Sequence, residues 1–210
     1  MTAPVETLHQ IDGPAGPIEL RLLPAEGQPR RIAVVCHPHP LHGGTMDNKV
    51  VYTLTRTLAA RGALAVRFNF RGVGKSAGAF DHGNGEQADL DAVTAWLRAQ
   101  PQAAGLPLWL AGFSFGSFVS AISANRLGAE QLISIAPPVQ RFDFDRHPLP
   151  TCPWLLVMGD ADEVVAPQAV FDWAAGLPGN ARMIRMAGAG HFFHGRLVEL
   201  REQLEAALPI

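Results

Sequence analysis

Short apolar runs alternate along the chain with segments in which apolar residues recur every three or four positions. Short continuous runs indicate buried strands, and the longer period indicates amphipathic helices. This pattern predicts strands at 31–36, 63–68, 107–112, 131–136, 154–159 and 182–186. It predicts helices at 46–61, 86–99, 115–126, 168–175 and 193–208. Strands and helices therefore alternate over most of the chain.

The predicted strands are apolar throughout, so neither face of their sheet is expected to contact water. Such strands are typical of a mostly parallel sheet with helices on both faces. A turn-rich stretch at 11–17 predicts a hairpin that adds antiparallel edge strands. We expect a single doubly wound α/β domain over 1–210, with the hairpin region inside 1–30. The segment 137–153 has only 17 residues, too few for a helical lid.

Composition and charge exclude several classes of protein. Apolar residues make up 48% of the chain and charged residues 17%, as in globular proteins. The net charge of −2 does little to neutralise a phosphate backbone, so we expect no nucleic-acid partner. No apolar run approaches the roughly 20 residues that span a bilayer, and 1–6 lacks the basic start of a signal peptide. We therefore expect no membrane partner.

The cysteine content indicates the compartment. Cys36 and Cys152 are too few for a disulfide framework, and each lies in an apolar, strand-like run. We interpret both as reduced core residues of a cytoplasmic protein.

Candidate chemistry follows the predicted strands, because ligands of such sheets bind outside the carboxyl ends of the strands. Gly112-Phe113-Ser114-Phe115-Gly116 follows one strand and opens a helix. A G-x-S-x-G sequence in this context predicts a sharp turn that presents a nucleophilic serine near the positive end of a helix. A helix N-cap serine at a tight turn is the alternative. We favour Ser114 as a nucleophile.

A serine hydroxyl needs a general base, and that base needs a carboxylate to orient it. His191 follows the last strand in a glycine-rich loop that can aim an imidazole across the strand ends. His194 is the runner-up, and is otherwise an ordinary helix-terminal or surface histidine. Three carboxylates follow the fifth predicted strand: Asp160, Asp162 and Glu163. Those that are not used are expected to cap turns or to lie in solvent.

The tetrahedral oxyanion of acyl transfer needs two N–H donors. The backbone of Phe115, directly after the serine, is the first candidate. The second is expected in the loop at 37–41, where two of the residues are prolines without an N–H. The backbone N–H of His39 is our choice, and that of Leu41 is the alternative.

Together these motifs resemble the α/β-hydrolase superfamily, in particular a small, lidless bacterial branch similar to dienelactone-hydrolase-like serine esterases. The resemblance spans roughly residues 17–208. It is carried by 37–40 with 43–44, 70–76, 112–116, 159–162 and 190–191. It implies Ser114, Asp162 and His191 as catalytic residues, because the family places its acid third after the glycine and has the chain order Ser, Asp, His.

The chain departs from the family pattern in two places. The usual His-Gly of the oxyanion loop is His-Pro here, which weakens the assignment of the second donor to His39. True dienelactone hydrolases use a cysteine nucleophile, so Ser114 implies ester chemistry without implying that substrate.

Two other patterns have simpler explanations. The segment 72–76 resembles the end of a P-loop, but Asn69 stands where the first glycine belongs, and no helix pattern follows. We interpret it as a turn packed beside the site. His37, His39 and His42 could suggest zinc, but alternate residues separated by prolines do not converge easily. We therefore expect no metal and no cofactor.

The expected activity is that of a serine hydrolase, a carboxylesterase that cleaves small to medium esters through an acyl-enzyme on Ser114. An uncapped site suits exposed acyl groups better than long, enclosed lipids, and 142–144 is expected to line one wall. A thioesterase or amidase with the same triad is an alternative, as is a non-catalytic ligand-binding protein of this fold. The expected partner is a small-molecule ester, and the pattern indicates no oligomeric state.

Overall fold

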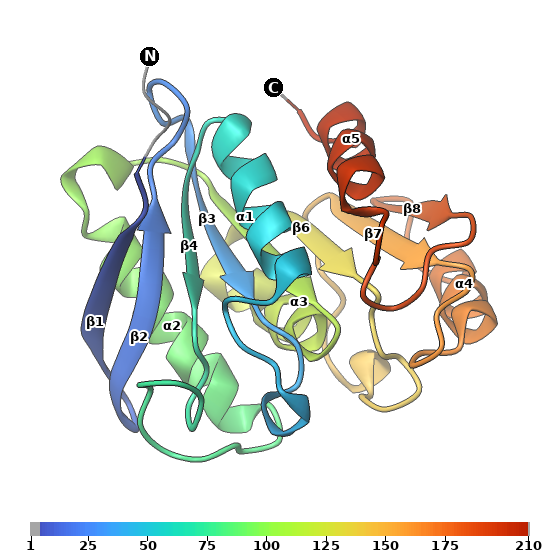
Figure 1. Ribbon diagram of the computed structural model, residues 1–210, viewed down its shortest axis with the longest axis horizontal. Coiled ribbons are helices and arrows are strands. Elements are labelled where there is room, and N and C mark those ends of the chain that lie inside the picture. The colour runs from blue at the N-terminus through green and yellow to red at the C-terminus, as the bar shows by residue number, and fades with distance from the viewer. Residues whose placement is uncertain (1–4, 210) are drawn as a thin grey trace.

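Eight strands form one sheet in the computed structural model, which describes residues 5–209 (Figure 1). The strands are β1 Thr7–Gly13, β2 Gly16–Leu23, β3 Arg31–Cys36, β4 Ala63–Phe68, β5 Leu108–Phe113, β6 Ala129–Ile135, β7 Trp154–Gly159 and β8 Ala181–Met186. Their order is β1-β2-β4-β3-β5-β6-β7-β8. The hairpin β1–β2 joins β4 antiparallel, and all other neighbours are parallel. The hairpin at the sheet edge is therefore confirmed.

Two expectations from the sequence involve residues outside 5–209. Residues 1–4, on which the expectation of no signal peptide partly rests, lie outside the described residues, as does residue 210. The single domain over 1–210 accordingly stays a prediction, although every strand of the described part belongs to one sheet.

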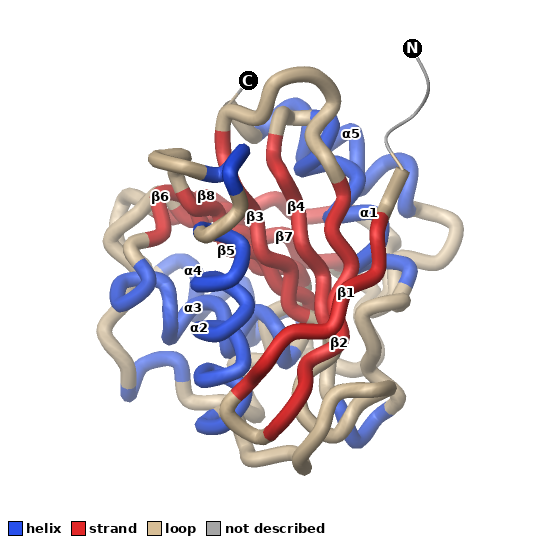
Figure 2. The backbone as a smooth tube through the Cα atoms, turned by 90° about the vertical axis from the view of Figure 1, so that its left-hand side faces the viewer, coloured by secondary structure: helices blue, strands red, loops and turns tan. Residues whose placement is uncertain are grey.

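Helices cover both faces of the sheet. They are α1 Lys49–Ala60, α2 Asn84–Arg98, α3 Phe115–Leu127, α4 Pro167–Ala175 and α5 Leu197–Ala207. Figure 2 shows α1 and α5 on one side of the sheet and α2, α3 and α4 on the other. Leu54 of α1 and Leu204 of α5 are buried in one core, and Leu90 of α2 and Val119 of α3 in the other. The expected doubly wound α/β fold is confirmed.

The last helix begins later than its apolar period predicts. The prediction placed its start at 193, whereas α5 begins at Leu197. Phe193 and Gly195 have φ values of 50° and 70°, which a right-handed helix does not allow. The earlier start is therefore wrong, because side-chain periodicity carries no information about left-handed backbone.

The segment 137–153 between β6 and β7 holds one short 3₁₀ turn, Phe144–Arg146. Asp143 caps this turn by accepting the Arg146 N–H at 3.2 Å. The described chain has no other helix or strand in this segment, so the fold is lidless, as expected. Across residues 5–209, no helix combines the length and apolarity needed to cross a membrane.

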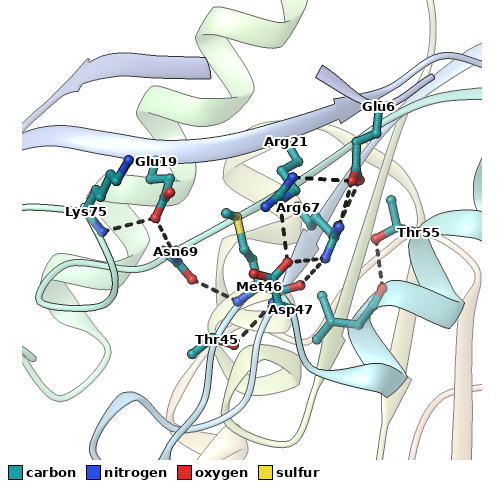
Figure 3. A network of polar contacts seen from close by, with 11 residues as sticks. Glu6, Glu19, Arg21, Thr45, Met46, Asp47, Thr55, Arg67, Asn69 and Lys75 are labelled. Atoms are coloured by element: carbon teal, nitrogen blue, oxygen red, sulfur yellow. Dashed lines mark hydrogen bonds and ion pairs between the residues drawn. The ribbon is translucent and has the colours of Figure 1, made fainter. Parts of the chain in front are cut away.

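A polar network ties the loop before α1 to the end of β4 (Figure 3). Arg67 is 3% exposed, and its Nη1 donates to the Met46 carbonyl at 2.7 Å and to Asp47 Oδ1 at 2.8 Å. Its Nε and Nη2 donate to the two carboxylate oxygens of Glu6 at 3.0 and 2.8 Å. Asn69 Oδ1 accepts the Met46 N–H at 2.8 Å. These bonds fix the β3–α1 loop, which carries both candidates for the second oxyanion donor.

His37 joins the same loop to the turn after β4. The ring is buried, its Nε2 accepts the Phe70 N–H at 3.0 Å, and its Nδ1 donates to the Pro38 carbonyl at 2.6 Å. A backbone N–H can only donate, so Nε2 carries no proton and the ring is neutral. Burial lowers the pKa of His37 from 6.5 to about 4. Both ring nitrogens are therefore used inside the protein.

Neutral, buried His37 should make the protein less stable in acid. The unfolded chain binds a proton on His37 below pH 6.5, whereas the folded chain resists protonation down to about pH 4. The stability from this group is thus full above pH 6.5 and falls as the pH drops toward 4, by roughly 3 kcal/mol in total. Urea unfolding measures this loss, and between about pH 7.5 and about pH 5 the wild type should lose about 2 kcal/mol more than His37→Gln. Equal losses in both proteins would contradict the prediction.

Candidate active site

Ser114 stands at a sharp turn between β5 and α3. Its φ of 52° and ψ of −120° form a conformation that residues with side chains rarely adopt. The Ser114 N–H donates to the Ile135 carbonyl at 2.8 Å, and the Ser114 carbonyl accepts the Ser117 N–H at 2.8 Å. Backbone strain of this kind persists only where the surrounding structure imposes it.

Two glycines make this turn possible. A Cβ on Gly116 would collide with the Cys36 carbonyl oxygen, and a Cβ on Gly112 would collide with the Gly116 carbonyl oxygen. The first turn of α3 can therefore pack directly against the end of β3. This approach brings the rings of Phe115 and His39 to a centroid distance of 5.2 Å.

His191 and Asp162 form a buried pair. Their Nδ1 and Oδ2 atoms lie 2.7 Å apart, and the two side chains are 3% and 0% exposed. The other carboxylate oxygen, Oδ1, accepts the N–H groups of Val164 and Val165 at 2.8 and 2.7 Å. These bonds fix the carboxylate so that Oδ2 faces the imidazole. Because Oδ2 accepts, Nδ1 carries the proton of the neutral ring and Nε2 is left as an acceptor.

The two neighbouring carboxylates hold the His191 loop in place. Glu163 Oε2 accepts the backbone N–H of His191 at 3.1 Å. Asp160 Oδ1 accepts the N–H of Gly188 at 2.6 Å, which is the turn-capping role expected of an unused aspartate. The sequence reasoning missed the contact of Glu163, because no spacing rule relates a carboxylate to a backbone N–H on another loop.

The candidate oxyanion donors differ in what they bind. Among residues 5–209, the N–H groups of Phe115 and His39 have no hydrogen-bond partner. The Leu41 N–H, in contrast, donates to His39 Nδ1 at 3.2 Å. The His39 carbonyl accepts the N–H groups of His42 and Gly44 at 3.1 and 3.0 Å, which closes the loop. Of the two alternatives for the second donor, this geometry favours His39.

Ser114 and His191 line one cavity of about 230 Å³. Its other lining residues come mainly from the loops after β3, β6 and β7: Pro38, His39, His42, Gly43, Gly44, Asn48, Phe115, Pro138, Arg141, Phe142, Val164, Val165 and Phe192. In the described part of the chain, no hydrogen bond joins Ser114 Oγ to His191. Catalytic hydrogen bonds are often long or poorly aligned in ligand-free enzymes and tighten when the substrate binds. The structure thus brings Ser114 and His191 to one cavity, with Asp162 behind the imidazole.

Other predicted residues lie elsewhere or act differently. His194 is exposed and does not line the cavity. Of the segment 142–144, only Phe142 lines it. Arg141 and Phe192 also line the cavity and were not predicted. The only sequence signal for them is that each stands beside a residue already singled out.

The glycine-rich segment 72–76 is a turn with no helix after it, so it is not a P-loop. Ser76 Oγ donates to the Asn69 carbonyl at 2.7 Å and closes the turn. The segment does not line the cavity. Phe80, further along the same loop, reaches the site instead, with its ring centroid 4.6 Å from that of His39.

The histidines considered as zinc ligands have separate hydrogen-bond partners. His37 binds two backbone groups, and His39 Nδ1 accepts the Leu41 N–H. Within the described range, no three His, Cys, Asp or Glu side chains are grouped so that they could hold a metal ion.

A serine on a strained turn after one strand, with an imidazole and a carboxylate supplied by later strands, is the arrangement of the α/β serine hydrolases. Comparison with known proteins leads to the same class. A family model described as X-Pro dipeptidyl-peptidase (S15 family) matches residues 21–149. This match includes Ser114 and ends before Asp162 and His191.

Solved structures match over the whole chain. XC6422 from Xanthomonas campestris, described as an a/b serine hydrolase without lid, is 45% identical, with a TM-score of 0.89 over 100% of this chain and 98% of that one. An alpha-beta serine hydrolase homologue from Coxiella burnetii is also 45% identical, with a TM-score of 0.91 over 100% and 99% of the two chains.

A relative of unknown function completes the comparison. An uncharacterised protein of Rickettsia prowazekii (strain Madrid E) is 36% identical over an alignment of 203 residues, and the alignment covers 92% of this chain and 85% of the relative. The chain belongs to the α/β-hydrolase superfamily, in the family described as X-Pro dipeptidyl-peptidase (S15 family). It is a hydrolase of the serine type.

Adding one methyl group at the turn should disrupt the site. Gly116→Ala forces the new Cβ against the Cys36 carbonyl, so we expect the free energy of unfolding to fall by about 2 kcal/mol. Gly179→Ala is the matched control, because a Cβ there meets nothing within 4 Å. Urea unfolding of both variants measures the difference. Equal stability of the two alanine variants would show that the space between Gly116 and the Cys36 carbonyl can accommodate a methyl group.

Proposed function

We propose that this chain is a carboxylesterase that cleaves small to medium carboxylic esters through an acyl-enzyme on Ser114. The observation that carries the proposal is the 2.7 Å hydrogen bond between His191 and Asp162 beside a cavity that Ser114 also lines. A carboxylate that holds Nδ1 leaves Nε2 to accept the serine proton. The reaction needs no cofactor.

In the proposed reaction, Ser114 Oγ attacks the ester carbonyl carbon while His191 Nε2 takes the hydroxyl proton. The N–H groups of Phe115 and His39 stabilise the oxyanion. The intermediate then expels the alcohol, which receives the proton from His191. Water then attacks the acyl-enzyme and gives a proton to His191, and Ser114 Oγ takes this proton back as the acid leaves. Asp162 stabilises the imidazolium at each step.

The shape of the cavity supports small to medium substrates. Its volume of about 230 Å³ and the absence of a lid between β6 and β7 in the described chain leave the acyl group open to water. Phe142, Phe192 and Val165 give the cavity apolar walls that can contact a short acyl chain. A long lipid would extend beyond these walls. A cytoplasmic location remains part of the proposal, and the two free, buried cysteines support it.

The family description makes peptide hydrolysis the second candidate. Thioesters and amides would be attacked by the same residues, so the leaving group decides between the activities. Purified protein is therefore assayed with short-chain p-nitrophenyl esters, matching thioesters and X-Pro p-nitroanilides. We expect the highest kcat/KM for the esters. Tight binding without any turnover would favour the non-catalytic alternative.

Removal of the nucleophile gives the main test. Ser114→Ala should lower kcat for a short-chain p-nitrophenyl ester on the order of 10⁴-fold or more, because the acyl-enzyme cannot form. A fluorophosphonate should label the wild type covalently at Ser114 and leave the variant unlabelled. Ser123→Ala, further along α3, is the control and should retain both turnover and labelling. Retained turnover in Ser114→Ala would refute the mechanism.

The carboxylate of Glu163 should act on the rate through the position of His191. Glu163→Ala removes the acceptor of the His191 N–H, so we expect kcat to fall about tenfold with little change in KM. Glu163→Gln keeps an oxygen at this place and should restore most of the rate. The measurement is ester turnover over a range of substrate concentrations. If Glu163→Ala and Glu163→Gln were equally slow, the negative charge of Glu163 and not its hydrogen bond to His191 would determine the rate.

A further inference from the structure

The cavity beside Ser114 carries one permanent positive charge and no negative charge on its walls. Arg141 is the only lysine or arginine among the residues that line it, and none of these residues is an aspartate or glutamate. Asp162 lies behind the wall, where its oxygens are occupied by His191 and by two backbone N–H groups. An anionic group entering the cavity would therefore meet a cation and no carboxylate on the lining.

The guanidinium is anchored on the cavity wall. Arg141 Nη2 donates to the carbonyl of Val164, itself a lining residue, at 3.1 Å. The backbone N–H of Arg141 donates to the Pro138 carbonyl at 2.9 Å, which fixes the base of the side chain. A guanidinium has five N–H donors, so this anchoring leaves most of them for a ligand.

No carboxylate of residues 5–209 pairs with this guanidinium. Arg67, Arg71 and Arg146 each pair with an aspartate, at 2.8, 2.8 and 2.7 Å. Arg141 has no acidic partner within 4.0 Å among the residues that the structure describes. Other arginines without such a partner do not line the cavity. Arg141 thus combines an unpaired charge with a place at the site.

His39, one of three histidines that line the cavity, does not supply the same charge at neutral pH. Burial lowers the pKa of His39, and the positive charges of His42, Arg141 and His82 lower it further. His39 is therefore neutral under ordinary conditions, and Arg141 provides the permanent charge of the cavity.

We propose that this cavity selects esters that carry a carboxylate, such as monoesters of short dicarboxylic acids, and that Arg141 binds the carboxylate. The inference rests on the proposed esterase function. A guanidinium binds a carboxylate through two parallel N–H bonds, which fixes orientation as well as charge. Phe142 and Phe192 offer apolar contact to the methylene chain between the carboxylate and the ester.

Matched substrates test this selectivity. Monomethyl glutarate is compared with methyl valerate, and monomethyl adipate with methyl hexanoate, so that each pair differs only in a terminal carboxylate or methyl group. The wild type should show a kcat/KM about tenfold higher for the charged member, and the ratio should fall as salt is added. Arg141→Gln should abolish the preference, and Arg141→Lys should keep part of it. Arg146→Gln, on the same segment but outside the cavity, should leave the ratio unchanged.

The outcomes separate this inference from the esterase proposal. A wild type that prefers the neutral esters, or treats both members alike, overturns the selectivity. A preference that survives in Arg141→Gln overturns the role of Arg141. If no ester is cleaved, the esterase proposal fails. The carboxylate subsite is then tested by itself, by titrating isotope-labelled protein with glutarate and with valeramide and measuring the affinity for each. Tighter binding of glutarate that is lost in Arg141→Gln supports the subsite, and equal binding overturns it.

Discussion

The first turn of α3 packs directly against the end of β3, and the rest of the site depends on this contact. Gly116 lies against the Cys36 carbonyl with no room for a side chain between them. The left-handed turn at Ser114 follows from the same constraint, and strain of this kind costs on the order of 1–3 kcal/mol. The two cores of the sheet provide the packing that holds it. A wider separation would move Phe115 away from the β3–α1 loop.

The loops around the cavity are held from outside it. The β3–α1 loop is fixed by Arg67 and by the buried ring of His37. The loop of His191 is fixed by the carboxylates of Asp160 and Glu163. Loops built only from their own residues would place a donor or an imidazole loosely, and small displacements weaken catalysis. The buried polar residues therefore contribute to the geometry of the site as well as to stability.

The sequence reveals those features that depend on local pattern. Apolar runs locate the strands of the sheet, and the glycines on either side of Ser114 require a tight turn. The start of α5 was misplaced because left-handed backbone at Phe193 leaves no trace in side-chain periodicity. The contacts of Glu163 and Arg141 were not predicted because they join loops that are distant in sequence. Such contacts become visible only once the strand order is known.

Glu6 stands just before β1, and its carboxylate binds a buried arginine of β4. The Glu6 carboxylate accepts hydrogen bonds from Nε and Nη2 of Arg67 (Figure 3). The third nitrogen, Nη1, donates to the Met46 carbonyl on the loop that also carries His39. Removal of Glu6 would leave the buried guanidinium of Arg67 with one carboxylate partner, Asp47, in place of two. Ser114, Asp162 and His191 would all be present, but the loop that carries His39 would lose one of its supports. Glu6 therefore helps to hold a loop that is far from it in sequence, and a substitution at this position would be felt at the edge of the cavity.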